Sequence, residues 1–193
     1  MHSTPAPSHG FDAASPWVQR WSQLLAPSAT VLDVACGGGR HVRWFAQRGH
    51  AVTALDRDER ALDGLRSVAE VMACDLEGSP WPLAGRRFGA VVVTNYLWRP
   101  LFPSLIDALD EGGVLICETF AVGQGSIGKP SNPDFLLRPQ ELLEAARGLR
   151  VVAYEDGFVA QPPRFVQRLA AVREPARVAP DSAPARYLLA AAD

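Results

Sequence analysis

The chain has 193 residues, a formal net charge of −2 and 48% hydrophobic residues. This length suits one domain with a single substantial core. The near-neutral charge, without a run of Lys and Arg, disfavours nucleic acid as a partner. No apolar run approaches the roughly 20 residues that a membrane span needs. We therefore expect neither nucleic acid nor a membrane among the partners.

The two ends and the cysteines indicate the compartment. Residues 1–14 are rich in Ser, Pro and Ala but lack the apolar region of a signal peptide, so we expect a flexible leader. Residues 174–193 are expected to form a Pro- and Ala-rich tail. Cys36, Cys74 and Cys117 are odd in number and far apart, which excludes a closed disulfide framework and a zinc-binding pattern. We predict no metal site and a cytoplasmic location.

Strand-like and helix-like patterns alternate between leader and tail. Helices are predicted at 15–25, 40–48, 58–68, 100–109 and 138–147, and strands at 30–34, 51–55, 71–74, 88–94, 114–118, 149–158 and 165–173. The turn Glu111-Gly112-Gly113 is expected to precede the fifth strand. The alternation predicts one α/β domain over residues 15–173, with a doubly wound, mostly parallel sheet. Pro162-Pro163 predicts that the last two strands form an antiparallel hairpin.

Three consecutive glycines follow the first strand and precede a helix. Glycines let the backbone approach a ligand closely and adopt positive φ, as Gly37–Gly39 would here. Asp56 follows Gly37 by 19 positions, near the roughly 20 expected of a carboxylate that binds a ribose. Val42 stands where the dinucleotide pattern has its third glycine. A nucleoside without a diphosphate therefore fits better than a dinucleotide.

Four segments in the correct order resemble the class I S-adenosylmethionine-dependent methyltransferases, and the similarity runs from Trp17 to Arg173. The segment from Asp33 to Gly39 resembles the first motif of the family, with Ala35 where many members have glycine. Asp56 matches the acid that holds the ribose hydroxyls. Cys74-Asp75-Leu76 matches the segment that borders adenine, and residues 94–97 match the segment below the methionine part.

The resemblance implies a Rossmann-like methyltransferase fold of seven strands, with S-adenosylmethionine as cofactor and S-adenosylhomocysteine as product. It also implies a compact enzyme similar to tellurite-resistance and thiopurine-type methyltransferases. The cofactor contacts that it implies are Asp33, Ala35, Cys36, Gly37, Gly39, Asp56, Arg57, Asp75, Leu76, Thr94 and Asn95.

The residues after the fourth and fifth strands are expected to face the substrate, since ligands bind at the carboxyl ends of the strands. They are Tyr96, Trp98, Arg99, Glu118 and Phe120. Glu118 is our first candidate for a general base, with a structural strand-end acid as the alternative. Tyr96 is the second catalytic candidate, because an aromatic wall stabilises a sulfonium through cation–π contact, although aromatic residues beside a loop also simply pack.

Two further segments are expected to cover the crevice. The glycine-rich stretch 120–138 is predicted to act as a lid. Its Lys129 and Arg138 could form a cationic mouth with Arg99 for an acidic substrate, the alternative being solvated surface charges. The leader helix with Trp17 and Trp21 is expected to fold over the cofactor, as in several related enzymes.

The predicted reaction is transfer of a methyl group from S-adenosylmethionine to a small-molecule acceptor by in-line displacement. A small acceptor is favoured because little sequence remains beyond the cofactor-binding fold. Two alternatives stay open: an NAD(P)-dependent oxidoreductase, and a non-catalytic module that binds the cofactor.

Overall fold

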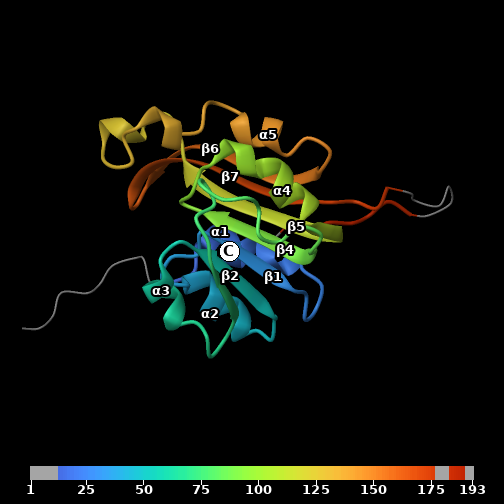
Figure 1. The fold of residues 1–193 in the computed structure, drawn as a ribbon. Helices are drawn as coiled ribbons and strands as arrows, with labels where there is room; N and C mark the ends of the chain where they lie inside the picture. Colours follow the sequence, from blue (N-terminus) through green and yellow to red (C-terminus); the bar gives the residue numbers. More distant parts are fainter. Residues whose placement is uncertain (1–12, 177–182, 190–193) are drawn as a thin grey trace, which may run out of the picture.

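The computed structural model describes residues 13–176 and 183–189. They form a seven-stranded sheet with the order β3-β2-β1-β4-β5-β7-β6 (Figure 1). The strands are β1 (Val31–Val34), β2 (Val52–Asp56), β3 (Glu70–Ala73), β4 (Phe88–Thr94), β5 (Leu109–Phe120), β6 (Arg150–Ala160) and β7 (Pro163–Val172). Strands β1 to β5 pair in parallel, and β7 is antiparallel to both β5 and β6. The predicted fold is confirmed, including its antiparallel C-terminal pair.

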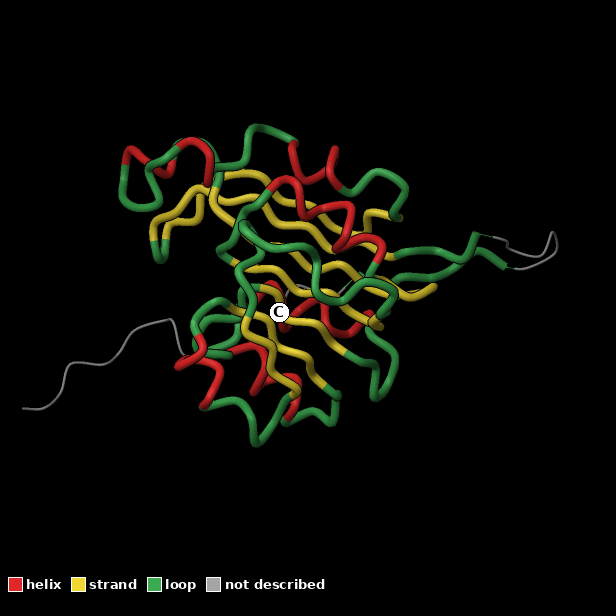
Figure 2. The backbone as a smooth tube through the Cα atoms, in the orientation of Figure 1, coloured by secondary structure: helices red, strands yellow, loops and turns green. Residues whose placement is uncertain are grey.

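The helices are shorter than predicted, and much of the chain between strands is loop (Figure 2). They are α1 (Pro16–Trp21), α2 (Arg40–Ala46), α3 (Glu59–Asp63), α4 (Phe102–Asp107) and α5 (Glu141–Ala145), with 3-10 turns η1 (Ser22–Leu24), η2 (Arg99–Leu101), η3 (Gln124–Ser126) and η4 (Pro133–Phe135). Two starts follow ordinary capping chemistry. The Ser15 hydroxyl accepts from the Trp17 N–H before α1, and the Asp58 carboxylate accepts from Arg60 and Ala61 before α3.

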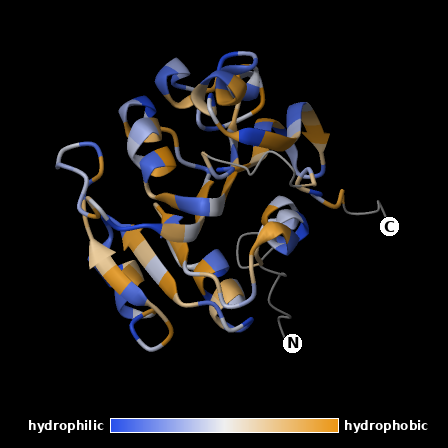
Figure 3. Ribbon diagram, turned by 90° about the vertical axis from the view of Figure 1, so that its right-hand side faces the viewer, coloured by the Kyte–Doolittle hydropathy of each residue, from blue (hydrophilic) through white to orange (hydrophobic). Residues whose placement is uncertain are grey.

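The core lies on both faces of the sheet. Val91 and Val93 pack on one face, with residues of α4 and α5, while Ala90 and Val92 pack on the other, with α1, α2 and α3. Successive residues of a strand point to opposite faces, so a continuous apolar run serves both layers. In Figure 3 the strands carry mainly hydrophobic residues, whereas the helices alternate between hydrophobic and hydrophilic ones.

The start of β5 differs from the prediction. The segment Glu111-Gly112-Gly113 is not a turn ahead of the strand but lies within it, because the strand begins at Leu109. The partner of β4 shifts there from Leu109 opposite Phe88 to Val114 opposite Ala90, so the residues between bulge out. A Cβ at Gly113 would lie 2.9 Å from the Phe88 carbonyl oxygen, which explains the glycine at this position.

The ends of the domain are described in part. The predicted leader falls mostly on residues 1–12, which lie outside the described residues. In the described part of the tail, Tyr187 donates to Glu174 (3.1 Å), and the Leu188 carbonyl accepts from Gln23 (3.1 Å). The limits of 15–173 for the domain stay a prediction. Within the described segments, no helix has the length and apolar character to cross a membrane.

Candidate cofactor-binding site

Two neighbouring hollows lie at the carboxyl ends of the parallel strands, and Ala35 lines both. The larger, of about 490 Å³, is lined by Ala35, Cys36, Gly37, Gly38, Arg40, Arg43, Thr94 and Asn95. The smaller, of about 280 Å³, is lined by Ala35, Asp56, Arg57, Cys74, Asp75, Leu76, Glu77, Tyr96 and Phe135. Together they form a crevice where the strand-end rule places it. Of the eleven predicted cofactor residues, all but Asp33 and Gly39 line it.

The three glycines of the turn have different structural roles. Gly39 has a φ of +74°, and a Cβ there would lie 2.4 Å from a methyl carbon of Leu65. A glycine is therefore needed at position 39, both for its left-handed backbone conformation and to leave room, at the start of α2, for the side chain of Leu65. An added Cβ at Gly37 or Gly38 would meet nothing within 4 Å. These two glycines leave open space beside the crevice, which a ligand could use.

Two residues other than glycine adopt the left-handed conformation in the larger hollow. Ala35 has a φ of +53° and Asn95 a φ of +54°. Such backbone costs on the order of 1–2 kcal/mol for a residue with a Cβ, and it is found preferentially at functional sites. Both strained positions therefore coincide with the crevice.

Asp56 connects the glycine turn to the end of β2. Its Oδ2 accepts from the Gly37 N–H (2.7 Å), and its Oδ1 accepts from the Asp58 N–H (2.9 Å). Each carboxylate oxygen has a second lone pair. The side chain is only half-buried and can accept further hydrogen bonds from the smaller hollow. Asp75, at the far side of that hollow, accepts from the Glu77 N–H (3.1 Å).

Asp33 lies behind the glycine turn and is 1% exposed. Its Oδ2 has no hydrogen-bond partner, and the Nδ1 of His41 lies 4.0 Å away. Burial raises the pKa of Asp33 to about 7, although Arg40 opposes the shift. Burial likewise lowers the pKa of His41 to about 3. His41 Nε2 accepts from the Ser15 N–H (3.1 Å), so the neutral imidazole carries its proton on Nδ1, beside Asp33.

Glu118 is 0% exposed and surrounded by donors. Its Oε2 lies 2.6 Å from Arg168 Nε, and its Oε1 lies 3.3 Å from Arg164 Nη1 and 3.1 Å from the Ser15 hydroxyl. These contacts join β5, β7 and the start of α1. They favour the structural alternative for Glu118 over proton abstraction, because the carboxylate is fully buried, Oε1 contacts two donors, and Oε2, without a hydrogen bond, is ion-paired with Arg168.

The predicted substrate-side residues are divided between two environments. Tyr96 lines the smaller hollow, where burial and the carboxylates of Glu77 and Asp75 raise its pKa to about 12. Its hydroxyl therefore stays protonated near neutral pH. Trp98 packs, half-buried, against the apolar cluster below α4, and Phe120 is half-buried at the end of β5.

The predicted cationic mouth is not formed. Arg99 Nε lies 2.6 Å from Glu141 Oε1, and Arg138 Nη2 lies 3.4 Å from the same oxygen. Arg99 and Arg138 thus share the single Glu141 carboxylate, while Lys129 stays exposed on the loop. The expectation for the leader helix is also wrong, because Trp17 and Trp21 are buried in the core of one sheet face instead of covering the crevice.

The sequence reasoning assigned no ligand contact to four residues that also line the crevice: Arg40, Arg43, Glu77 and Phe135. Arg40 follows the glycine turn directly, which was a usable signal. Burial raises the pKa of the Cys36 thiol, and it raises that of Cys117 to about 12, so both behave as small apolar residues. Among the residues that the structure describes, no group of three or more His, Cys, Asp or Glu side chains could hold a metal ion.

Comparison with known proteins agrees with this geometry. Residues 31–113, which include the glycine turn and Asp56, match the family model described as a methyltransferase domain. Over these residues the chain is similar to a methyltransferase domain. Its matched part runs from β1 into β5 and contains most residues of both hollows.

Three individual proteins are similar to this chain. TehB from Haemophilus influenzae has a TM-score of 0.66 at 16% identity, over 79% of this chain and 60% of that chain. The glycopeptide N-methyltransferase MtfA, solved with sinefungin, has a TM-score of 0.60 at 20% identity, over 89% of this chain and 99% of that chain. These likenesses show the fold.

The third similarity is short. A stretch of 43 residues, 22% of this chain, is 51% identical to ribosomal RNA small subunit methyltransferase H of Gemmatimonas aurantiaca and covers 14% of that protein. The chain therefore spans less than two thirds of both TehB and the ribosomal RNA enzyme.

Proposed function

We propose that the chain transfers a methyl group from S-adenosylmethionine to a small-molecule acceptor. The observation that carries this proposal is the polarity of the crevice. One hollow presents the carboxylates of Asp56 and Asp75, and the other presents Arg40 beside open glycine backbone. A nucleoside joined to an amino acid has hydroxyl and amine donors at one end and a carboxylate at the other.

The residues of the smaller hollow suit an adenosine group. Asp56 retains acceptor capacity for the two ribose hydroxyls, and Asp75 could accept from the exocyclic amine. Leu76 and Phe135 supply apolar contact for the base.

The larger hollow suits a zwitterionic amino-acid group. Arg40 could pair with a carboxylate, since guanidinium matches carboxylate geometry in two parallel hydrogen bonds. The unpartnered oxygen of Asp33, behind the same turn, would balance an ammonium group directly or through a water molecule. Ala35 lines both hollows and so marks the place where the two halves of the ligand would meet.

S-adenosylmethionine supplies a methyl group bonded to a positively charged sulfur. The lone pair of an acceptor bonds to the methyl carbon and displaces the sulfur in line. The protein must then orient the acceptor and exclude water, which accounts for large accelerations in well-aligned reactions. Any proton that the acceptor loses can pass to solvent, so the buried Glu118 has no required part in the transfer.

A small acceptor is favoured over RNA because the chain has a net charge of −2 and four of its arginines are engaged with carboxylates. Arg99 and Arg138 contact Glu141, while Arg164 and Arg168 contact Glu118. RNA binding depends on cations that are free to meet phosphates. The free thiols of the three cysteines support a location in the reducing cytoplasm.

Binding experiments test the cofactor first. Calorimetric titration with S-adenosylhomocysteine should give saturable binding, and NADH should give none. Asp56→Ala should weaken that binding about 10- to 100-fold, the equivalent of one or two charge-assisted hydrogen bonds. Asp63→Ala is the matched control, because this carboxylate lies exposed on α3 and contacts only Arg66. Binding of NADH alone would support the oxidoreductase alternative and end the proposal.

Transfer experiments test the acceptor. Incubation with methyl-labelled S-adenosylmethionine and a panel of metabolites should place the label in a small molecule. A parallel reaction with ribosomal RNA should remain unlabelled. Label in the RNA would overturn the small-molecule acceptor, and tight cofactor binding without transfer to either pool would favour the non-catalytic module.

A further inference from the structure

Phe135 is an aromatic side chain that lies at the rim of the smaller hollow with much of its surface in contact with solvent. It belongs to η4 and is 42% exposed, although it lines the same space as Asp56 and Asp75. A large exposed aromatic side chain beside a binding hollow has apolar surface left to bury against a ligand.

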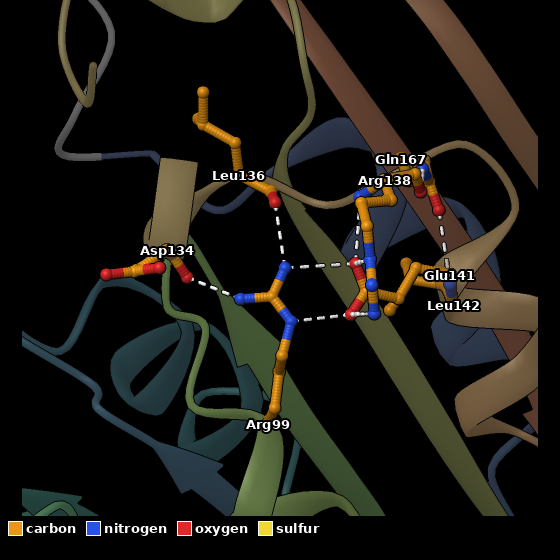
Figure 4. Close-up of polar contacts among 7 residues, drawn as sticks. All are labelled: Arg99, Asp134, Leu136, Arg138, Glu141, Leu142 and Gln167. Atoms are coloured by element: carbon orange, nitrogen blue, oxygen red, sulfur yellow. Dashed lines mark hydrogen bonds and ion pairs between the residues drawn. The ribbon is translucent and has the colours of Figure 1, made fainter. Parts of the chain in front are cut away.

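Arg99 holds the backbone on both sides of Phe135. Its Nη1 donates to the Asp134 carbonyl (2.6 Å) and its Nη2 donates to the Leu136 carbonyl (2.9 Å), as Figure 4 shows. In the described part of the chain, Arg99 is the one side chain of another element that donates hydrogen bonds to residues 134–136. Arg99 follows β4, so it connects Phe135 to the central strand of the sheet.

Glu141 fixes the guanidinium group of Arg99. The two side chains form a two-point contact, with Nε to Oε1 at 2.6 Å and Nη2 to Oε2 at 3.0 Å. Burial would raise the pKa of Glu141, but hydrogen bonds from Arg99 and Arg138 outweigh it and lower the pKa to about 2. The carboxylate is therefore ionised throughout the physiological range, and the pairing persists.

The segment on either side of Phe135 is fastened to the sheet. Leu137 donates to the Phe120 carbonyl (2.9 Å) and accepts from Val122 (2.9 Å), which closes the loop at its base. Beyond it, Gln167 of β7 donates to the Arg138 carbonyl (2.6 Å). With the base of the loop fixed in this way, Arg99 determines where Phe135 lies relative to the hollow.

We propose that Arg99 is a positioning residue that, paired with Glu141, holds Phe135 as an apolar cover over the nucleoside hollow. This inference rests on the proposed function, because it assigns the covered ligand as the adenosine part of the cofactor. The guanidinium group itself meets backbone carbonyls and a carboxylate, so it acts through Phe135 and makes no contact with the ligand. Only a planar fork of donors can serve both carbonyls and the carboxylate at once, so Lys cannot replace it.

Affinity for S-adenosylhomocysteine and for adenosine tests this proposal. Phe135→Ala should weaken both about 5- to 100-fold, the range observed when a base loses an aromatic partner. Arg99→Lys should weaken both by a similar factor. Phe135→Leu, which keeps apolar contact, should recover part of the loss. Arg138→Lys is the matched control: its side chain shares Glu141 but is 71% exposed and does not contact residues 134–136, so the affinities should stay within twofold.

A double-mutant cycle separates positioning from a general effect on stability. If Arg99 acts through Phe135, then Arg99→Lys should change the affinity by less than twofold once Phe135 is Ala. Should Arg99→Lys fail to fold, Glu141→Gln provides the second route, because it loosens the pair and keeps both carbonyl contacts. It should produce a smaller loss of the same kind.

Three outcomes would overturn the inference while leaving the proposed function intact. These are unchanged binding in Arg99→Lys and Phe135→Ala, strictly additive losses in the cycle, and an altered KM for the acceptor at unchanged cofactor affinity. Failure of the wild-type protein to bind S-adenosylhomocysteine would instead contradict the proposed function itself.

Discussion

Asp33→Asn tests the electrostatics of the crevice, because the substitution keeps the shape of the side chain and removes its charge. The carboxylate is 1% exposed, and its pKa is raised from 3.8 to about 7, chiefly by burial. Between these two pH values the folded state retains a proton that the unfolded chain has released. The contribution of Asp33 to the free energy of unfolding is therefore fully present below about pH 4 and is lost as the pH rises through 7.

The expected change in the free energy of unfolding follows from the shift in the pKa of Asp33. About three pKa units at about 1.36 kcal/mol per unit amount to about 4 kcal/mol as the upper limit of the loss at pH 8. Urea denaturation should therefore show Asp33→Asn to be more stable than the wild type at pH 8, by about 2–4 kcal/mol. At pH 4 the two should differ by less than about 1 kcal/mol. Asp63→Asn, which changes an exposed carboxylate, should follow the wild type at both pH values.

Asp33→Asn should weaken cofactor binding at neutral pH, although it should raise the stability of the protein at pH 8. A cationic ammonium group near Asp33 would draw the proton off the carboxylate, so wild-type affinity for S-adenosylhomocysteine should rise between pH 6 and pH 7.5, with proton release. Asp33→Asn should bind about tenfold more weakly at pH 7.5 and lose that pH dependence. The reasoning would be refuted if Asp33→Asn were less stable than the wild type at pH 8 and its stability changed with pH in parallel with that of the wild type. The Asp33 carboxylate of the wild type would then be ionised and well solvated.

Four other substitutions follow from the same contacts. Gly39→Ala should lower the free energy of unfolding by about 2–5 kcal/mol, because the added Cβ strains the left-handed backbone and overlaps with Leu65. Gly38→Ala should fold normally and weaken cofactor binding. Thermal melts with and without S-adenosylhomocysteine measure both effects. Glu118→Gln should cost about 3 kcal/mol in urea denaturation, since it leaves Arg164 without its counter-charge and Arg168 with Glu155 alone. Ser15→Ala should cost about 2–4 kcal/mol, because it removes both the N-cap and a hydrogen bond to the buried Glu118, with cofactor affinity unchanged.

The fold and the cofactor crevice could be predicted from the sequence because their signals are local. The run Val91–Val93 identifies a strand covered on both faces, and the turn Gly37–Gly39 directly follows another strand. Parallel strands bring their carboxyl ends to one edge, so Asp56 and Asp75 could be placed in a common site without any knowledge of contacts.

The pairing of charges could not be predicted in this way, because it depends on partners far along the chain. Glu118 meets Arg164 across 46 positions, and Arg99 meets Glu141 across 42. Periodicity shows that each of these side chains lies near the end of a strand or the start of a helix. It carries no information about which acid and which base form an ion pair with each other.

These pairings change which residues can select the acceptor. Arg99 and Glu118 were assigned to the substrate because they follow or end the fourth and fifth predicted strands. Both instead form ion pairs within the protein. An acceptor would have to reach the junction of the two hollows at Ala35, and the side chains left open beside that junction are Asn95 and Tyr96. One is an uncharged amide and the other a phenol that keeps its proton, with a pKa of about 12. For the proposed acceptor we therefore expect selectivity by shape and hydrogen bonding, which suits an acceptor that is nucleophilic without a protein base.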